Sequence, residues 1–137
     1  MNISKKIKTL ALCIGVLLVS LPSYAHGDMK SQIEQKMSWG EVPQLLYICN
    51  EGGVTLELLA DPIKHTKEEA GKILGEFFKN HPAESCKIQS QGKYANDTRY
   101  FTGSYTTKEG AVYEAYFEAA LDQDDGHYHI SLIRIEK

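Results

Sequence analysis

The sequence lacks the features that would place it in a common functional class. Its main apolar run, "TLALCIGVLLV" from Thr9, is too short to span a bilayer comfortably. There is no C-x-x-C spacing, no internal repeat and no catalytic motif that rises above chance. A basic surplus is also absent, because residues 26–137 contain 12 basic and 18 acidic side chains. An acidic chain without a basic stripe argues against nucleic acid and anionic membranes as partners.

The first 25 residues have the pattern of a cleaved export signal. Three lysines precede the apolar run, and "LPSYA" then places small residues at Ser23 and Ala25. We expect cleavage after Ala25, which leaves a mature chain that begins at His26. The protein is therefore predicted to be periplasmic or secreted, without a membrane anchor.

Two cysteines, Cys49 and Cys86, remain after cleavage. In an oxidising compartment an even pair favours one disulfide, and closing a loop of about 38 residues would stabilise the fold by about 4 kcal/mol. The alternatives are two buried free thiols, or a metal or redox pair. Without a C-x-x-C spacing the last is the weakest, and we predict a Cys49–Cys86 disulfide.

Helical patterns come first in the chain. Apolar residues four apart predict a short helix over 29–37, and Pro43 and Gly52 mark the start and end of a second one. "VTLELL" from Val54 alternates like a strand. Thr66 and Glu69 then form a capping box for an amphipathic helix that presents two phenylalanines on its apolar face.

Strand patterns follow from Cys86 onward. Four segments separated by turn residues predict a meander, namely "CKIQSQGKY", "RYFTGSYTT", "AVYEAYFEAAL" and "HYHISLIRI". This order indicates an α+β fold in which N-terminal helices pack on one face of a curved antiparallel sheet. The 112 residues of 26–137 suit one domain.

Turn chemistry predicts how the last strands pair. The "TKEGA" turn sets Tyr105 opposite Tyr113, with Gly103 opposite Ala115 and Phe101 opposite Phe117. Asp125-Gly126 fits a two-residue type I′ turn, which sets three further pairs: Asp124 with His127, Asp122 with His129, and Leu121 with Ile130.

This register assigns the last strand to two faces. Ile130, Leu132 and Arg134 would face the helices, while Ile133 and Ile135 would join Tyr116 on the outer face, enough apolar surface for a homodimer contact.

The histidines of the final hairpin raise the question of a metal site. An H-x-H pair with two cross-strand aspartates is a plausible four-ligand set: Asp122, Asp124, His127 and His129. The alternative is an ordinary solvated face with favourable Asp–His neighbours. Because the hairpin tip is exposed and offers no second shell to orient the rings, we favour the hairpin and predict neither metal nor cofactor.

Small residues on the inner face, such as Gly103, could leave space between sheet and helices. An aromatic-lined space with a few polar groups is the usual form of a small-molecule site. We hypothesise that the anionic part of a ligand meets Arg134 in a pocket lined by Tyr105, Tyr113, Phe117 and Arg134. The alternative is a filled core, with Arg134 at a strand end or paired with a carboxylate.

Several segments of the sequence resemble a known group of proteins. "GEFFKNHPAESCKIQSQGKY", "YFTGSYTTKEGAVYEAYF" and "HYHISLIRIEK" are similar to small exported bacterial proteins of the domain of unknown function 4783 type. More broadly, the chain resembles the nuclear transport factor 2-like (cystatin-like) superfamily. The likeness is best from Thr66 to Lys137 and implies a cone of helices against a curved sheet. The group has no established activity, so the resemblance implies none.

Enzymes of the wider superfamily, such as the ketosteroid isomerases, place an Asp or His inside the cone. The predicted register puts no Asp, Glu or His of the last two strands there. We therefore predict a non-catalytic exported domain that binds a small ligand or an envelope protein. The alternatives are an isomerase- or cyclase-like enzyme that uses the cone pocket, and a structural dimeric interaction module.

Overall fold

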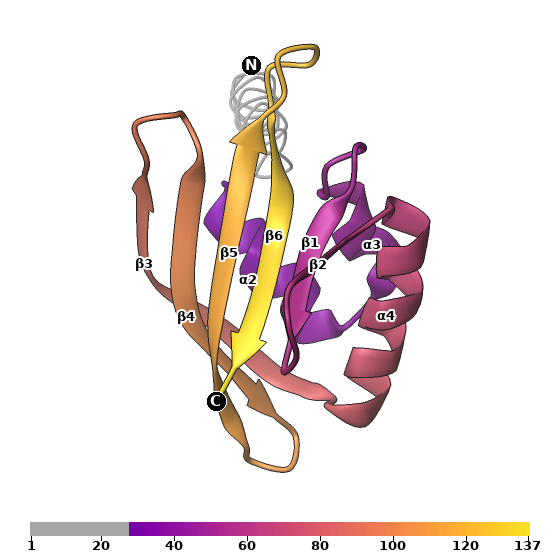
Figure 1. The fold of residues 1–137 in the computed structure, drawn as a ribbon. Coiled ribbons are helices and arrows are strands. Elements are labelled where there is room, and N and C mark those ends of the chain that lie inside the picture. The colour runs from indigo at the N-terminus through magenta and orange to yellow at the C-terminus, as the bar shows by residue number, and fades with distance from the viewer. Residues whose placement is uncertain (1–27) are drawn as a thin grey trace, which may run out of the picture.

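The computed structural model describes residues 28–137, so the predicted signal and its cleavage site lie outside the described residues. The strands form one six-stranded sheet. Figure 1 shows that this sheet is curved, with α2 behind it and α4 beside its β1 end. The helices are α2 (Met29–Trp39), α3 (Val42–Tyr47) and α4 (Lys67–Asn80). The strands are β1 (Val54–Leu58), β2 (Ile63–His65), β3 (Ala83–Lys93), β4 (Arg99–Thr107), β5 (Val112–Leu121) and β6 (Tyr128–Glu136).

Local signals set the ends of two helices. The Asp28 side chain accepts a hydrogen bond from Ser31 N at 2.8 Å and so caps α2, which ends at Gly40 in the left-handed conformation. At α4 both bonds of the predicted capping box are present, between Thr66 and Glu69. Such caps depend only on neighbours in sequence, which is why the pattern predicts them correctly.

The second helix is shorter than predicted. α3 ends at Tyr47, and the chain then runs beside β6, where Asn50 N donates to Ile130 O at 2.8 Å and Ile130 N donates to Ile48 O at 2.7 Å. These bonds take up the backbone groups that another helical turn would have used. The predicted end at Gly52 is therefore wrong.

The sheet order is β2-β1-β6-β5-β4-β3. The predicted meander of β3, β4, β5 and β6 is confirmed, and each neighbouring pair is antiparallel. However, β1 pairs with β6 in parallel, so the sheet is mixed rather than purely antiparallel. Strand β2 was not predicted, because its three residues are too few to show alternation.

The β4–β5 register is as predicted, with Tyr105 opposite Tyr113 and Phe101 opposite Phe117. The β5–β6 register is not. The final turn is longer than two residues, since Asp122 N donates to His127 O at 2.8 Å and Gly126 N donates to Asp122 O at 2.9 Å. A type I′ turn needs two positive φ angles. Here Gly126 has φ 72°, whereas Asp125 is not among the residues with positive φ.

A bulge in β6 then changes which residues face the core. Glu118 pairs with Leu132 and Ala119 pairs with Ile130, so Ser131 is the extra residue. An extra residue reverses the inward–outward alternation beyond it. Ile133 and Ile135 are consequently fully buried, and Arg134 lies on the outer face beside Tyr116. The predicted inward Arg134 and the predicted outer stripe of isoleucines are both wrong.

The N-terminal half of β3 is covered along its free edge. β3 is the last strand of the sheet, so its outward N–H groups have no strand partner. Side chains of α2 take their place: Ser38 Oγ accepts from Cys86 N at 3.0 Å, and Glu34 Oε2 accepts from Ile88 N at 2.8 Å. Helix α2 thus closes this edge as well as packing on the sheet.

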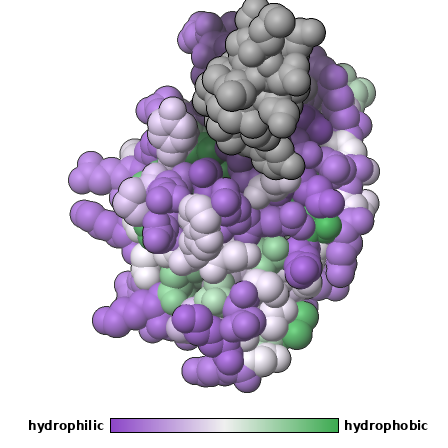
Figure 2. All heavy atoms as spheres, turned by 180° about the vertical axis from the view of Figure 1, so that it is seen from behind, coloured by the Kyte–Doolittle hydropathy of each residue, from purple (hydrophilic) through white to green (hydrophobic). Residues whose placement is uncertain are grey.

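The helix-bearing side is largely polar at its surface. Figure 2 shows this side from behind, with small apolar groups scattered among hydrophilic side chains. The most exposed large hydrophobic residue of the described range is Tyr47 of α3, at 81%. No helix within residues 28–137 has the length and apolar character needed to cross a membrane.

Candidate functional site

The space between the sheet and α4 is filled by aromatic side chains. Tyr105 is fully buried, its ring centroid lies 5.6 Å from that of Phe77 and 6.4 Å from that of Phe78, and its hydroxyl donates to His81 O at 2.6 Å. Burial raises the pKa of this phenol. Phe117 is fully buried in the same core. Both residues are buried in the core, so neither presents an exposed surface to the predicted inner pocket.

Close packing against β3, rather than space for a ligand, explains the glycine at position 103. A Cβ atom at this position would collide with the carbonyl oxygen of Lys87 and would lie 2.8 Å from Ile88 Cα. Gly103 pairs with Ile88 immediately before an irregularity in the β3–β4 ladder. The close approach of β3 therefore requires glycine at this position.

The four residues proposed for the pocket are not brought together inside the cone. Tyr105 and Phe117 belong to the core, whereas Arg134 lies on the outer face. Tyr113 is half-buried near the sheet margin, with its ring centroid 5.9 Å from that of His81. Only Tyr113 and Arg134 share a hollow, and it lies on the side of the sheet away from the helices.

The predicted disulfide is wrong in this structure, because Cys49 and Cys86 are both buried free thiols. Cys49 lies beside β6 and Cys86 lies on β3, so β6, β5 and β4 intervene between them. Adjacent strands are about 4.8 Å apart, whereas the Cα atoms of a disulfide are at most about 7 Å apart. Burial raises the pKa of each thiol to about 12.

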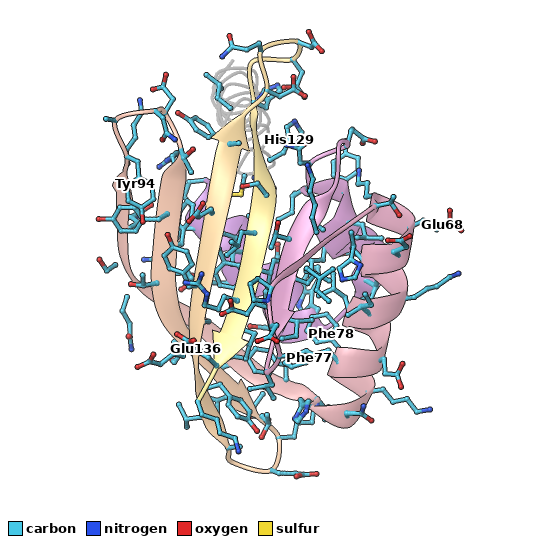
Figure 3. The ribbon with its side chains drawn as sticks, in the orientation of Figure 1. Glu68, Phe77, Phe78, Tyr94, His129 and Glu136 are labelled. Atoms are coloured by element: carbon cyan, nitrogen blue, oxygen red, sulfur yellow. The ribbon has the colours of Figure 1, made fainter. Side chains whose placement is uncertain are left out.

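The outer face of the sheet contains a hollow of about 620 Å³, which we call the outer-face trough. It crosses β3, β4, β5 and β6. In Figure 3, Glu136 marks its lower end on β6, and Tyr94 lies at the β3 margin of the sheet. The polar residues that line it are Gln89, Thr102, Ser104, Tyr113, Glu114, Tyr116, Arg134, Glu136 and Lys137.

A network of hydrogen-bonded side chains adjoins the trough at Tyr116. The Tyr116 hydroxyl donates to Glu118 Oε2 at 2.7 Å and lies 2.7 Å from the Tyr94 hydroxyl. Because Tyr116 has only one proton to donate, Tyr94 is the donor to Tyr116. The Tyr94 ring also packs on Tyr100, with centroids 4.9 Å apart. Burial, together with the bonds from Tyr94 and to Glu118, raises the pKa of Tyr116.

Arg134 is held in place by two neighbours. Its Nε lies 2.6 Å from Glu57 Oε2, and its guanidinium carbon lies 4.9 Å from the Tyr116 ring centroid. The side chains of Arg134 and Glu57 are 32% and 17% exposed, so the pair is partly shielded from water. An arginine fixed by a carboxylate and an aromatic face carries little free charge for an anionic ligand.

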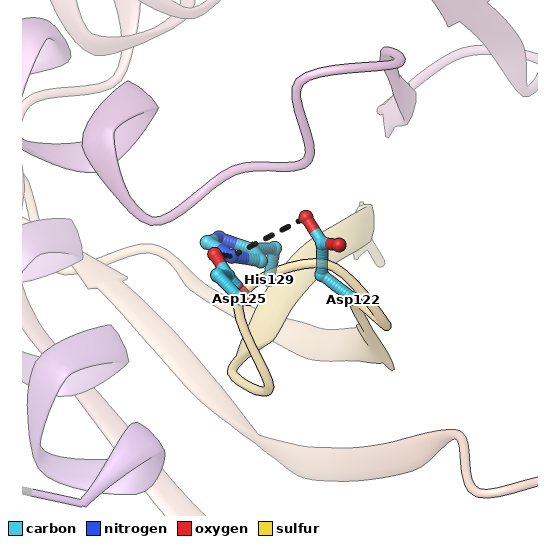
Figure 4. Close-up of side chains that lie close together, drawn as sticks. All are labelled: Asp122, Asp125 and His129. Carbon is cyan, nitrogen blue, oxygen red and sulfur yellow. Dashed lines mark hydrogen bonds and ion pairs between the residues drawn. The ribbon is translucent and has the colours of Figure 1, made fainter.

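The final hairpin brings together a smaller set of ligand-type residues than predicted. Figure 4 shows the carboxylates of Asp122 and Asp125 directed toward the His129 ring. His129 Nε2 lies 2.6 Å from Asp125 Oδ2 and 3.9 Å from Asp122 Oδ2. Asp124 and His127 are exposed and stand outside this group, because the longer turn changes the pairing.

Backbone groups orient both carboxylates of the hairpin. Asp124 N donates to Asp122 Oδ1 and His127 N donates to Asp125 Oδ1, each at 2.8 Å. The bond from His127 N, followed by the bond from His129, holds the pKa of Asp125 below its ordinary value. His129 Nδ1 is buried and has no hydrogen-bond partner among the described residues. The three ligand atoms lie within 4.8 Å of one another, so a divalent cation would find suitable donors but no second shell on the imidazole.

Sequence reasoning missed several residues of these sites. Glu57, Tyr94 and Glu118 take part through contacts between strands that are distant in the chain. The alternation in "VTLELL" already predicts that the Glu57 side chain points to the opposite face of the sheet from Leu56 and Leu58. Asp125 was assigned to the turn, and only a longer loop makes it the partner of His129.

Comparisons with known proteins agree with this fold. A family profile, domain of unknown function DUF4783, matches residues 30–136. A crystal structure of a DUF4783 family protein from Bacteroides fragilis YCH46 is 22% identical, with a TM-score of 0.70 over 80% of this chain and 99% of that one. A second, from Bacteroides uniformis ATCC 8492, is 21% identical, with a TM-score of 0.70 over 80% and 97%.

A third structure, named "Rd1NTF2_04 with long sheet", is 16% identical, with a TM-score of 0.55 over 77% of this chain and 94% of that one. At such identities the likeness shows the fold alone, and that fold is of the nuclear transport factor 2-like type. Among curated proteins, none matches the sequence significantly. The match of the family profile to nearly the whole described range places the chain in the family of domain of unknown function DUF4783.

Proposed function

We propose that this protein is a non-catalytic binding domain of the cell envelope, exported by residues 1–25, and that its recognition surface is the outer face of the sheet. The observation that carries the proposal is the contrast between the two faces. The helix-bearing face is filled by buried apolar side chains, whereas the opposite face contains a polar hollow of about 620 Å³. That volume lies within the range of small-molecule sites.

The character of the core supports binding over catalysis in the cone. Thr107 is the buried polar residue of the described range, and no Asp, Glu or His of that range is buried with it. An enzyme of the isomerase or cyclase kind needs an acid or base beside its substrate inside the cone. The alternative of an enzyme that uses the cone pocket therefore lacks its central group in the described part of the chain.

The alternative of a dimeric module has also lost its original support. The predicted contact relied on Ile133 and Ile135, and both are fully buried in the core. The outer face instead carries hydroxyl, amide and charged groups with a few tyrosines. Such a surface suits a polar ligand or partner better than a permanent apolar interface.

The test begins with the protein purified from the envelope of its own cells. Intact mass is expected to show a chain that begins at His26, and native mass spectrometry is expected to show a bound molecule or partner. Ser104→Arg places a long side chain in the trough, and Ser31→Arg on α2 is the matched control on the helix side. We expect only Ser104→Arg to remove the bound species. Retention of the species by Ser104→Arg, or a cytoplasmic location of the protein, would overturn the proposal.

A further inference from the structure

We propose that the outer-face trough takes an uncharged, hydroxyl-rich ligand of the oligosaccharide class, a choice of ligand that presupposes the proposed function. The chemistry of the lining leads to this class in three steps: its charge balance, its free hydrogen-bonding groups, and the aromatic ring at its margin.

The charges that line the trough cancel. Glu114 and Glu136 face each other across β5 and β6, and Arg134 and Lys137 lie beside them. An anionic ligand would meet two carboxylates and an arginine already paired with Glu57. A cationic ligand would be opposed by Lys137, for which no ion pair is present among residues 28–137. In a mature chain with six more acidic than basic side chains, a balanced lining of this kind favours a neutral ligand.

On β4 and β5 the lining offers side-chain rather than backbone hydrogen bonds. The side chains of Gln89, Thr102 and Ser104 make no hydrogen bond to another residue of the described range, so their donors and acceptors are free for a ligand. The backbones of β4 and β5 are paired on both sides within the sheet. An extended peptide could not add there as a strand. A ligand that carries its own hydroxyl groups can bond to these side chains directly.

An aromatic ring adjoins the trough through Tyr116, a lining residue whose hydroxyl lies 2.7 Å from that of Tyr94. Tyr94 is 45% exposed, although its hydroxyl is fixed to Tyr116 and its ring packs on Tyr100. A rigid, partly exposed tyrosine suits a ligand with an apolar C–H face and polar edges, such as a pyranose ring. The three spacings between β3 and β6 make the trough about 14 Å wide, which a short oligosaccharide can fill.

The test is a titration of ¹⁵N-labelled protein followed by NMR. The neutral probes are maltohexaose, cellohexaose and chitohexaose, and the charged comparators are hexagalacturonate and hexalysine. We expect at least one neutral probe to cause saturable shifts at the amides of Thr102, Ser104 and Tyr116. Tyr94→Ala is expected to weaken that binding about tenfold, whereas Tyr47→Ala, which removes an exposed tyrosine on the helix side, leaves it unchanged.

Several outcomes would overturn this assignment. They are no saturable shift with any neutral probe, stronger binding of a charged comparator in the trough, and shifts that depend on protein concentration alone, which would indicate a second copy of the chain on this face. The Ser104→Arg experiment separates the two proposals. If Ser104→Arg still removes the species bound in the envelope while the neutral probes fail, the ligand class is wrong and the binding function stands.

Discussion

Arg134 and Tyr116 face each other on neighbouring strands, with the guanidinium carbon 4.9 Å from the ring centroid, and Glu57 completes the arrangement from β1. Three strands are thereby joined on the outer face by one side chain. Glu57 and Arg134 are also directly opposite each other in the parallel β1–β6 ladder, so their ion pair supports that register.

Arg134→Met is expected to lower the free energy of unfolding by about 1–2 kcal/mol, because it leaves the largely shielded Glu57 carboxylate without its partner. Urea unfolding measures the change. Adding Glu57→Gln to Arg134→Met should recover part of the loss, since no unpaired carboxylate then remains. Strictly additive losses in the double variant would show that the two side chains are not coupled.

Gly103→Ala is expected to destabilise the fold by about 2 kcal/mol or more, since its Cβ would collide with the Lys87 carbonyl oxygen. Gly75→Ala is the matched control. Gly75 lies within helix α4, and a Cβ there would meet only Val42 Cγ2, at 3.8 Å. This change should therefore stabilise the fold by about 0.5–1 kcal/mol. Thermal unfolding distinguishes the two, and a Gly103→Ala variant as stable as the parent would argue against the close approach of β3.

The buried thiols predict a loss of stability in alkali. An ordinary thiol has a pKa of 9.0, and burial raises that of Cys49 and Cys86 to about 12. Above pH 9 the unfolded chain releases both protons while the folded chain retains them, so the folded state loses stability as pH rises from about 9 toward 12. For two thiols the slope reaches about 2.7 kcal/mol per pH unit.

Urea unfolding between pH 8 and pH 11 should show this slope, and Cys49→Ala with Cys86→Ala should reduce it. The same thiols should react with a disulfide reagent only in urea. Rapid reaction of either thiol in the native protein at pH 8 would contradict the burial.

The final hairpin should respond to acid through Asp125. The Asp125 carboxylate has a lowered pKa in the folded state. Its contribution to folded-state stability is therefore fully present above the ordinary pKa and is lost as pH falls through the folded-state pKa. The His127 amide resonance, followed by NMR from pH 6 to pH 2, should report the loss of the bond to Asp125. Asp125→Asn should abolish this titration and Asp124→Asn should leave it unchanged. Equal profiles for both variants would exclude Asp125 as its cause.

Zinc gives a separate test of the hairpin. His129 Nε2 already has Asp125 as its partner, and Nδ1 has no second-shell acceptor among the described residues. We expect Zn²⁺ to bind only weakly, with dissociation at or above about 0.1 mM in a calorimetric titration. A submicromolar dissociation constant that His129→Ala removes would instead establish a metal centre formed by Asp122, Asp125 and His129.

Local features of this fold are predictable from sequence, and features that depend on pairing are less so. Thr66 and Glu69 specify the start of α4 through residues three apart, and the turn after Thr107 sets Tyr105 opposite Tyr113. The bulge at Ser131 depends on how β6 meets β5. Neither strand reveals it alone, although it reverses the direction of Arg134.

The candidate site was less predictable than the fold for the same reason. The predicted pocket depended on the direction of Arg134, and the predicted disulfide depended on two cysteines whose separation is set by the order of strands in the sheet. The position of Tyr116 on the outer face, by contrast, follows from alternation along β5 and was predicted correctly. What no local pattern indicated is that this face is hollowed.

Because Glu34 and Ser38 accept hydrogen bonds from backbone amides of β3, they also affect whether other chains can pair with this strand. Exposed strand margins are the places where unrelated chains join and grow into fibrils. The opposite margin, β2, has only three residues and gives an incoming strand little to extend. The sheet is therefore shielded by helix α2 along the N-terminal half of β3, and at β2 by the shortness of the strand.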